Sequence, residues 1–392
     1  MEMDAAFHWS GLKTYRMPPD VGSFVIMNDE NMVQRALEFL ALQLLNVPER
    51  VPPYVIEALT DSKVRDQVLY EARRNRVLFR SLSTLLERRD IPSQLVVDLR
   101  PLLEQCWKRI RGTLQITAQV QGAMDRKGVG FCIFKSVPDF PDLNAEIDVL
   151  VRGEARQVAD EALRSLEPVS VGKGSWETPD KLHYVYSLDG EEYEVELYPR
   201  FTEYGEVYIP DDSVIDRARM VALEGTEVRC PTVEDELLVV CTHTMYRHGG
   251  IIKLSDVVAA VRMLRDQGVD LGQTYDNARL CGVTRGLDLF LSWINGYYET
   301  RFGNTILPPS MLSRLPDSNV VRASAIAFPY RFSAMSVTCL LMDKVYQDLK
   351  QRRLSSAYAG SKTLATKFAS RVLYTAFRLT KQEQALKRFG WA

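Results

Sequence analysis

Apolar side chains recur every three to four positions from Asn31 to about Met124, as they do along the buried face of amphipathic helices. The segment "ENMVQRALEFLALQLLN" starts this pattern, and the prolines at 48, 52 and 53 end its first helix because proline cannot continue the helical hydrogen bonds. Residues 1 to about 30 follow no such period. We therefore expect an N-terminal helical region over residues 1–127.

The pattern changes at Gly128, where short apolar runs replace the helical period. The runs "VGFCIFK" and "EIDVLV" are typical of buried strands, and a proline-rich loop separates them. An amphipathic helix follows Gly153, and two alternating runs then meet at Asp189-Gly190, a strong hairpin signal. This predicts an α/β unit over 128–212, in the order strand, loop, strand, helix, strand, strand.

The helical period returns at about Ser213 and predicts a helical domain over 213–315, followed by a basic helical segment over 316–392. Thr232 and Asp235 form an approximate capping box at the start of one of these helices. The predicted fold class is therefore α/β (α+β), with a small mixed sheet between N-terminal and C-terminal helical regions.

Composition excludes several classes of protein. The 392 residues are 46% hydrophobic and 26% charged, with a net charge of −2, so no overall field favours nucleic acid. No segment matches a secretory signal, and charges interrupt every apolar stretch before the roughly 20 residues of a membrane helix. The six scattered cysteines form no metal-binding motif. We therefore expect a cytoplasmic protein with reduced thiols and no transmembrane segment.

Two carboxylates start the predicted strand "EIDVLV", and they are the first candidates for chemistry. Glu146 and Asp148 are two residues apart and so share one face of the strand. In the hairpin's second strand the same spacing relates Glu192, Glu194 and Glu196. If these strands are neighbours, three carboxylates converge, and their oxygens are the ligands that Mg²⁺ prefers. The alternative is that they are solvated residues on an exposed face.

The stretch "FKSVPDFPDLNAEIDVLV", with "YEVELYPR" some 45 residues later, resembles the nucleotidyltransferase superfamily of the DNA polymerase β type. It is closer to a poorly characterised branch written "Lys-Gly … Asp-Ile-Asp-Leu-Leu-Val … Val-Asp-Leu-His". In that branch a helix with histidines follows, then an Arg/Lys-Leu-x-x-Asp stretch, as in "CTHTMYRHGGIIKLSDVV" here. The resemblance covers about residues 128–300, and the N-terminal helical region lies outside it.

The resemblance implies transfer of a nucleoside monophosphate from an NTP to a hydroxyl or amine, with release of pyrophosphate. It implies that Glu146, Asp148 and Glu196 hold one or two Mg²⁺ ions, for which Mn²⁺ can substitute. The turn at Lys135-Ser136 would present backbone N–H groups and the Ser136 hydroxyl to the triphosphate. This chain departs from the pattern in three places, since Ser136 replaces the usual glycine and glutamate stands at the first and third carboxylates.

Other polar residues of this pattern allow two interpretations. His243 and His248 are five apart, too far round an α-helix to share one face as a zinc pair, and a structural role is the alternative to chemistry. Lys253 can reach the triphosphate or pair with Asp256. Glu192 and Glu194 fit solvated hairpin charges, although Glu194 takes the place of Glu196 if the register differs.

Residues 345–392 carry ten Lys or Arg against Asp348 and Glu383. This segment can contact RNA, lie on an anionic membrane, or simply present a solvated basic face. Three hypotheses follow for the whole protein. The first hypothesis is a Mg²⁺-dependent nucleotidyltransferase with a small-molecule acceptor. The second is an enzyme that performs the same chemistry on RNA or protein. The third is a catalytically degenerate protein that binds nucleotides or acts as a scaffold.

Overall fold

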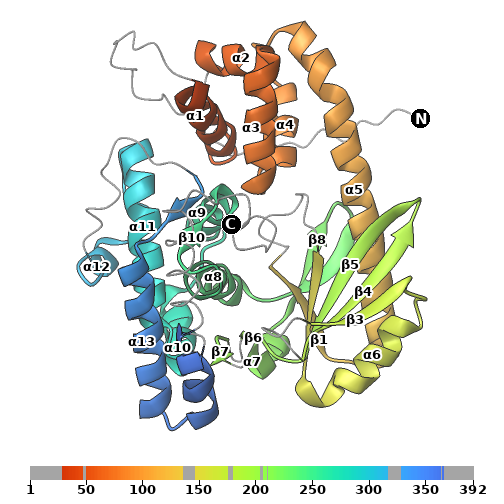
Figure 1. Cartoon of the computed structure of the whole chain (residues 1–392), viewed down its shortest axis with the longest axis vertical. Coiled ribbons are helices and arrows are strands. Elements are labelled where there is room, and N and C mark those ends of the chain that lie inside the picture. Colours follow the sequence, from red (N-terminus) through yellow and green to blue (C-terminus); the bar gives the residue numbers. More distant parts are fainter. Residues whose placement is uncertain are drawn as a thin grey trace, which may run out of the picture.

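The computed structural model describes residues 29–46, 50–135, 146–174, 180–203, 206–209, 211–316, 328–362 and 364–365. Ser136 with its loop and most of the basic C-terminal segment lie outside these residues. Helices α1–α4 form one end of the molecule, a small sheet lies at the lower right, and helices α8–α13 lie at the lower left (Figure 1). The expected fold class is confirmed, with a mixed sheet between two helical regions.

The N-terminal region consists of helices, as its periodicity predicts. They are α1 (Asp29–Leu42), α2 (Pro53–Thr60), α3 (Ser62–Arg74), α4 (Leu78–Leu86) and α5 (Ser93–Arg126). Helix α5 has 34 residues and so extends about 50 Å, from the N-terminal helices to the back of the sheet (Figure 1). Trp107 packs edge-on against Phe79 of α4, while Gly112 lies against Tyr193 of the sheet. This helix therefore fixes the N-terminal helices relative to the sheet.

The sheet has five strands in the order β1-β2-β5-β4-β3, and only β2 and β5 are parallel neighbours. Along the chain, this α/β unit consists of β1 (Phe131–Phe134), β2 (Glu146–Val151), the 3₁₀ turn η1 (Gly153–Ala155), α6 (Arg156–Arg164), β3 (Ser170–Lys173), β4 (Leu182–Leu188) and β5 (Glu191–Tyr198). Asp189 and Gly190 have φ values of 52° and 77°, which confirms the expected hairpin turn. The edge strand β3 was not expected, because its sequence "SVGK" has a single large apolar residue.

The prediction of helical structure from about Ser213 is wrong for residues 219–230. After β6 (Thr202–Glu203), β7 (Glu206–Val207) and α7 (Asp211–Asp216), strands β8 (Arg219–Leu223) and β9 (Thr226–Cys230) form a hairpin. Glu224 and Gly225, with φ values of 48° and 77°, make its turn. A two-residue turn with positive φ at both positions matches the twist of antiparallel strands, and this outweighs the local helical pattern.

The described residues from Val233 to Lys350 are mostly helical, with two short strands. They form α8 (Val233–Thr242), the π-helical turn η2 (His243–Arg247), β10 (Ile251–Ile252), α9 (Leu254–Asp266), α10 (Leu271–Cys281), α11 (Thr284–Phe302), α12 (Pro309–Leu312), β11 (Tyr330–Arg331) and α13 (Ala334–Lys350). The Thr232 side chain accepts a hydrogen bond from the Asp235 N–H, so the predicted cap of α8 is confirmed. No helix in the described ranges is both long and apolar enough to cross a membrane. All six cysteines are free thiols, and five are buried.

Two apolar cores lie on opposite faces of the sheet. One includes Ile147, Val149 and Val195 and packs against α5 and α6. The other includes Leu150 and Tyr198 and is continuous with the helical regions. Successive strand residues point to opposite faces. Asp148, which lies between Ile147 and Val149, must therefore face the C-terminal helices. The sheet therefore presents Asp148 to the space in front of α8.

Candidate active site

The register of the parallel pair β2 and β5 brings three carboxylates together. Asp148 is the direct partner of Glu196, and Glu146 is the partner of Glu194. One ligand oxygen from each of Glu146, Asp148 and Glu196 lies within 4.8 Å of the others. Asp148 is 4% exposed and Glu196 is 2% exposed, so both are buried and not solvated surface charges. The structure thus brings together the three carboxylates that the sequence singled out.

Two lysines neutralise part of this negative charge. Lys135 Nζ lies 2.9 Å from Asp148 Oδ1, and Lys181 Nζ forms an ion pair with Glu196 Oε1. Tyr198 accepts hydrogen bonds from both lysines, at 3.1 and 3.2 Å, and donates one of 2.5 Å to Glu196 Oε2. Three carboxylates against two ammonium groups leave one negative charge, which a metal cation can balance.

Lys135 occupies a strained position at the end of β1. Its φ is 64°, in the left-handed region that non-glycine residues seldom adopt. This conformation turns the chain sharply after Phe134 and aims the ammonium group at Asp148 and the Tyr198 ring. Backbone strain of this kind persists only where the surroundings enforce it, and it concentrates at functional sites. The predicted partner in this turn, Ser136, lies outside the described residues.

Glu146 and Glu196 differ in protonation behaviour. Burial, and then the charges of Asp148 and Glu196, raise the pKa of Glu146. Burial opposes ionisation of Glu196 too, but hydrogen bonds from Lys181 and Tyr198 outweigh it and lower its pKa. Burial also lowers the pKa of Lys135, against the opposing attraction of Asp148. The folded protein therefore favours the protonated form of Glu146 and the ionised form of Glu196.

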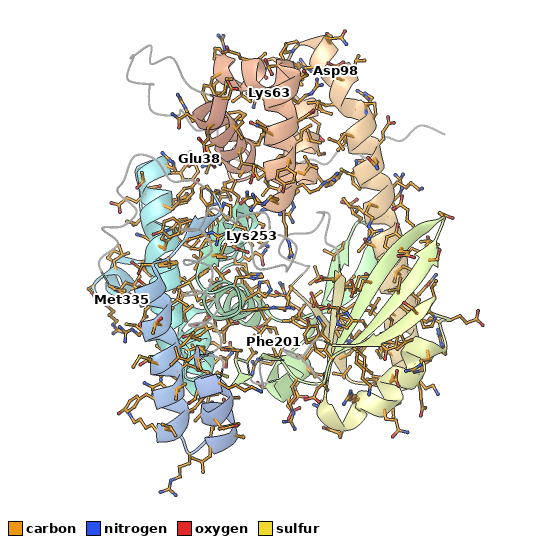
Figure 2. All side chains as sticks on the ribbon, in the orientation of Figure 1. Glu38, Lys63, Asp98, Phe201, Lys253 and Met335 are labelled. Atoms are coloured by element: carbon orange, nitrogen blue, oxygen red, sulfur yellow. The ribbon has the colours of Figure 1, made fainter. Side chains whose placement is uncertain are left out.

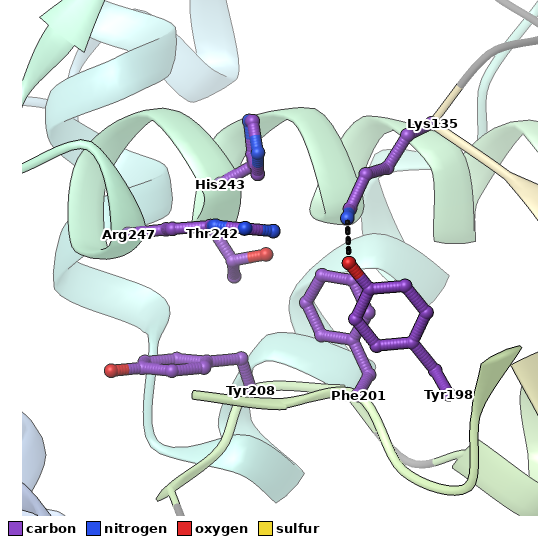
Figure 3. Close-up of a pocket in the computed structure, with 7 residues that line it drawn as sticks. All are labelled: Lys135, Tyr198, Phe201, Tyr208, Thr242, His243 and Arg247. Atoms are coloured by element: carbon purple, nitrogen blue, oxygen red, sulfur yellow. Dashed lines mark hydrogen bonds between the residues drawn. The ribbon is translucent and has the colours of Figure 1, made fainter. Parts of the chain in front are cut away.

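A pocket lies beside the carboxylates, with about 270 Å³ of empty space that includes open solvent. Figure 3 shows its lining, which is basic and aromatic: Lys135, Tyr198, Phe201, Tyr208, Thr242, His243 and Arg247. Phe201 lies between the sheet and α8 (Figure 2), and its ring packs edge-on against Phe134 at 5.3 Å. The sheet, the segment after β5 and the π-helical turn all contribute to this lining, so the pocket exists only in the folded chain.

The π-helical turn η2 places two histidines side by side. His248 N–H donates to the His243 carbonyl over 2.9 Å, and the two rings are 4.2 Å apart. On an α-helix residues five apart diverge, so the sequence-based estimate of their separation is wrong. Burial, and then His248 and neighbouring cations, hold the pKa of His243 well below its usual value, while burial lowers that of His248 to about 2. Both imidazoles are therefore neutral at physiological pH.

The other residues that the sequence singled out lie as follows. Lys253 precedes α9, and its N–H donates to Asp256 Oδ2 over 2.8 Å, so Asp256 caps this helix. Glu194 Oε1 accepts a hydrogen bond of 2.5 Å from His183 Nδ1, and Glu192 is exposed. His183, Glu194 and Glu196 also form a group of possible metal ligands, next to the first group. Lys253 does not line the pocket.

Sequence reasoning missed several residues of this site. Tyr198 is two residues after Glu196, so the strand period alone could have placed it on the same face. Lys181 precedes β4, and His183 is the cross-strand partner of Glu196. Arg247 lies in the π-helical turn. Nothing in the periodicity marks Lys181 or Arg247, because their positions depend on strand order and on an irregular turn.

A family model described as "uncharacterised nucleotidyltransferase" matches residues 61–299. The match covers more than half of the chain, which therefore belongs to this family of nucleotidyltransferases. It begins at α3 and so includes N-terminal helices that the sequence resemblance, limited to about residues 128–300, left out. No curated protein and no solved structure matches the chain.

Proposed function

We propose that this nucleotidyltransferase moves a nucleoside monophosphate from an NTP to a hydroxyl or amine of a small-molecule acceptor and releases pyrophosphate. The observation that supports this most is the convergence of Glu146, Asp148 and Glu196 beside a basic pocket. Carboxylates in this arrangement suit metal binding, and cationic groups next to them suit the phosphates of a nucleotide. The family assignment supports the same class of reaction.

The three carboxylates fit a divalent cation. All donors are oxygens, and they lie within 4.8 Å of one another. Burial, and then the charges of Asp148 and Glu196, raise the pKa of Glu146, and a bound cation would stabilise its ionised form. We propose that these residues hold Mg²⁺ or Mn²⁺, as one or two ions. When bound, the cation supplies charge neutralisation at the phosphate oxygens of the NTP.

Other side chains supply what the proposed reaction needs besides the metal: phosphate binding, an ionised metal ligand and a surface for the substrate. Lys135 lies at the boundary between the carboxylates and the pocket, where its ammonium group can bind a phosphate oxygen. Tyr198 and Lys181 keep Glu196 ionised by donating hydrogen bonds to it, and an ionised Glu196 is suited to act as a metal ligand. Phe201 and Tyr208 give the pocket aromatic surface.

The departures from the family pattern favour a second candidate, a degenerate nucleotide-binding protein. Glutamate stands at the first and third carboxylate positions, and serine replaces the glycine after Lys135. The longer side chain of Glu196 nevertheless reaches the same group of ligands as Asp148. This geometry is the reason that we prefer the active enzyme.

Transfer of label from each α-labelled NTP into a cell extract tests the proposal, with Mg²⁺ or Mn²⁺ present. We expect a labelled product from the wild type and none from Asp148→Asn. Glu192→Gln is the matched control, because Glu192 is on the same strand as Glu196 but exposed. A product that Asp148→Asn still makes would refute the assigned site. Metal-dependent NTP binding without any product would favour the degenerate protein.

A further inference from the structure

Arg76 is a half-buried cation in the turn between α3 and α4. Within the described part of the chain, no hydrogen bond or ion pair reaches its guanidinium group. Its φ is 55°, again in the left-handed region that is unfavourable for a residue with a Cβ. A partly buried charge without a hydrogen-bonded or ion-paired partner is costly, so such a residue calls for a physical explanation.

The turn that carries Arg76 is held in place by its neighbour Asn75. Asn75 is fully buried, and its side-chain amide oxygen accepts from the Leu254 N–H over 3.2 Å. Its carbonyl accepts from the Ser255 N–H over 3.1 Å. The Asn75 amide nitrogen donates back to Glu71 in α3. The turn is therefore fixed against the start of α9, and the position of Arg76 is set by the fold.

The turn that carries Arg76 lies close to the π-helical turn η2, because Asn75 binds the start of α9 and the Gly250 N–H, just before that helix, donates to the Thr244 carbonyl of η2 over 3.0 Å. The positive charge of Arg76 contributes to the lowered pKa of His243 and His248, and it partly offsets the raised pKa of Glu146. Its charge therefore acts both on the carboxylates and on the histidine pair that borders the pocket. Lys135 and Arg247 line that same pocket. The turn after α3, the end of β1 and the π-helical turn η2 are far apart in the sequence, and each thus supplies one cation to the region around the pocket.

The dipole of α3 does not account for this arrangement. A helix C-terminus favours cations, but Arg73 and Arg74 already supply two in the last turn. Both are exposed, and Arg74 pairs with Glu71 over 2.8 Å. Arg76 differs from them because it is half-buried, has no such partner among the described residues and acts on Glu146.

We propose that Arg76 binds the polyphosphate tail of the nucleotide, together with Lys135 and Arg247. This inference rests on the proposed function and deepens it. The site has carboxylates that suit a metal ion at one end and cationic side chains at the other. This arrangement matches a metal-bound anion that carries several phosphates. A guanidinium group suits the role because its fork of N–H donors binds two phosphate oxygens at once. The N-terminal helices then belong to the nucleotide site.

Calorimetric titration of the full-length protein with Mg²⁺ and ATP, GTP, CTP, UTP or AMP tests this, with inorganic tripolyphosphate as a base-free probe. Arg76→Asn removes the charge, while asparagine tolerates the left-handed backbone. We expect it to weaken tripolyphosphate and NTP binding about 10- to 100-fold, the range for a lost hydrogen bond to a charged group, and to leave AMP binding unchanged. Arg73→Gln is the matched control and should bind like the wild type.

The outcomes separate this inference from the proposed function. If the wild type binds tripolyphosphate and Arg76→Asn binds it equally well, the inference fails and the proposed function stands. Equal losses for AMP and tripolyphosphate would also overturn it. A wild type that binds neither NTP nor tripolyphosphate would overturn both. Should Arg76→Asn not fold, Arg76→Gln removes the charge and keeps a longer side chain, and unchanged tripolyphosphate affinity in that variant would refute the role.

Discussion

Asp148 and Glu196 are direct partners across the parallel strands β2 and β5, and each already holds a lysine ammonium group. Lys135 and Lys181 therefore occupy positions on these carboxylates that a metal cation would share or take. We expect a divalent cation bound there to weaken at least one of the two ion pairs. The proposed metal binding and the stability of the sheet would then depend on each other.

Replacing Lys181 by methionine should make the fold depend on metal. Loss of one partner from a buried ion pair costs about 3–5 kcal/mol, because Glu196 is left buried without its counter-charge. We expect thermal unfolding of Lys181→Met at clearly lower temperature in EDTA, and a larger gain on addition of Mg²⁺ or Mn²⁺ than the wild type shows. Equal metal-induced gains in both proteins would contradict the role of Lys181 as a counter-charge.

Glu146 should destabilise the metal-free protein as pH rises. Its folded-state pKa lies above the ordinary value of 4.5, so the folded protein binds a proton more readily than the unfolded chain. Its contribution to stability therefore falls as pH increases from the unfolded pKa through the folded one. Glu146→Gln should be more stable than the wild type at pH 7 in EDTA, with the difference vanishing below pH about 4. Denaturant unfolding across this range measures it.

Metal binding should show the converse pH dependence. A proton on Glu146 competes with the cation, and this proton is retained to higher pH than in an ordinary glutamate. We expect Mn²⁺ affinity to fall as pH decreases toward the raised pKa of Glu146. His243 and His248 should add no step between pH 6 and 7, since both remain neutral there. Titration of Mn²⁺ at a series of pH values checks both statements.

Two glycines of α5 should respond oppositely to alanine. A Cβ at Gly112 would lie 1.8 Å from the Tyr193 hydroxyl oxygen, whereas one at Gly122 meets only the Arg126 guanidinium at 3.4 Å. Overpacking should make Gly112→Ala less stable by about 1–3 kcal/mol. Gly122→Ala should gain up to about 1 kcal/mol from helix propensity. Similar free energies of unfolding for both variants would show that α5 does not pack closely on the sheet.

Removing the basic C-terminal residues should not change the acceptor if it is a small molecule. The truncation must begin after residue 365, because Asp348 is fully buried and binds Lys344 and Ser356 within and just after α13. We expect the truncated protein to label the same small product as the full chain. A loss of labelled RNA or protein on truncation would instead support the second hypothesis from the sequence.

The sequence by itself determined which carboxylates share a strand face, because the two-residue period of a strand is a local property. Glu146 and Asp148 share a face in any strand, and Glu196 shares one with Glu194. The family motif added which of the later glutamates belongs with the pair. Helical periodicity likewise fixed most of the helices, and Asp189-Gly190 fixed a hairpin.

Only the tertiary structure decided which other side chains meet these carboxylates. The order β1-β2-β5-β4-β3 brings Lys181 to Glu196, and no local pattern encodes strand order. One extra residue per turn in η2 brings His243 to His248, because a π-helical hydrogen bond joins residues five apart. The turn that carries Arg76 is fixed against α9 through contacts between segments about 180 residues apart in sequence, such as Asn75 with Leu254. Periodicity describes one segment at a time, so it cannot place residues whose positions depend on how segments pack.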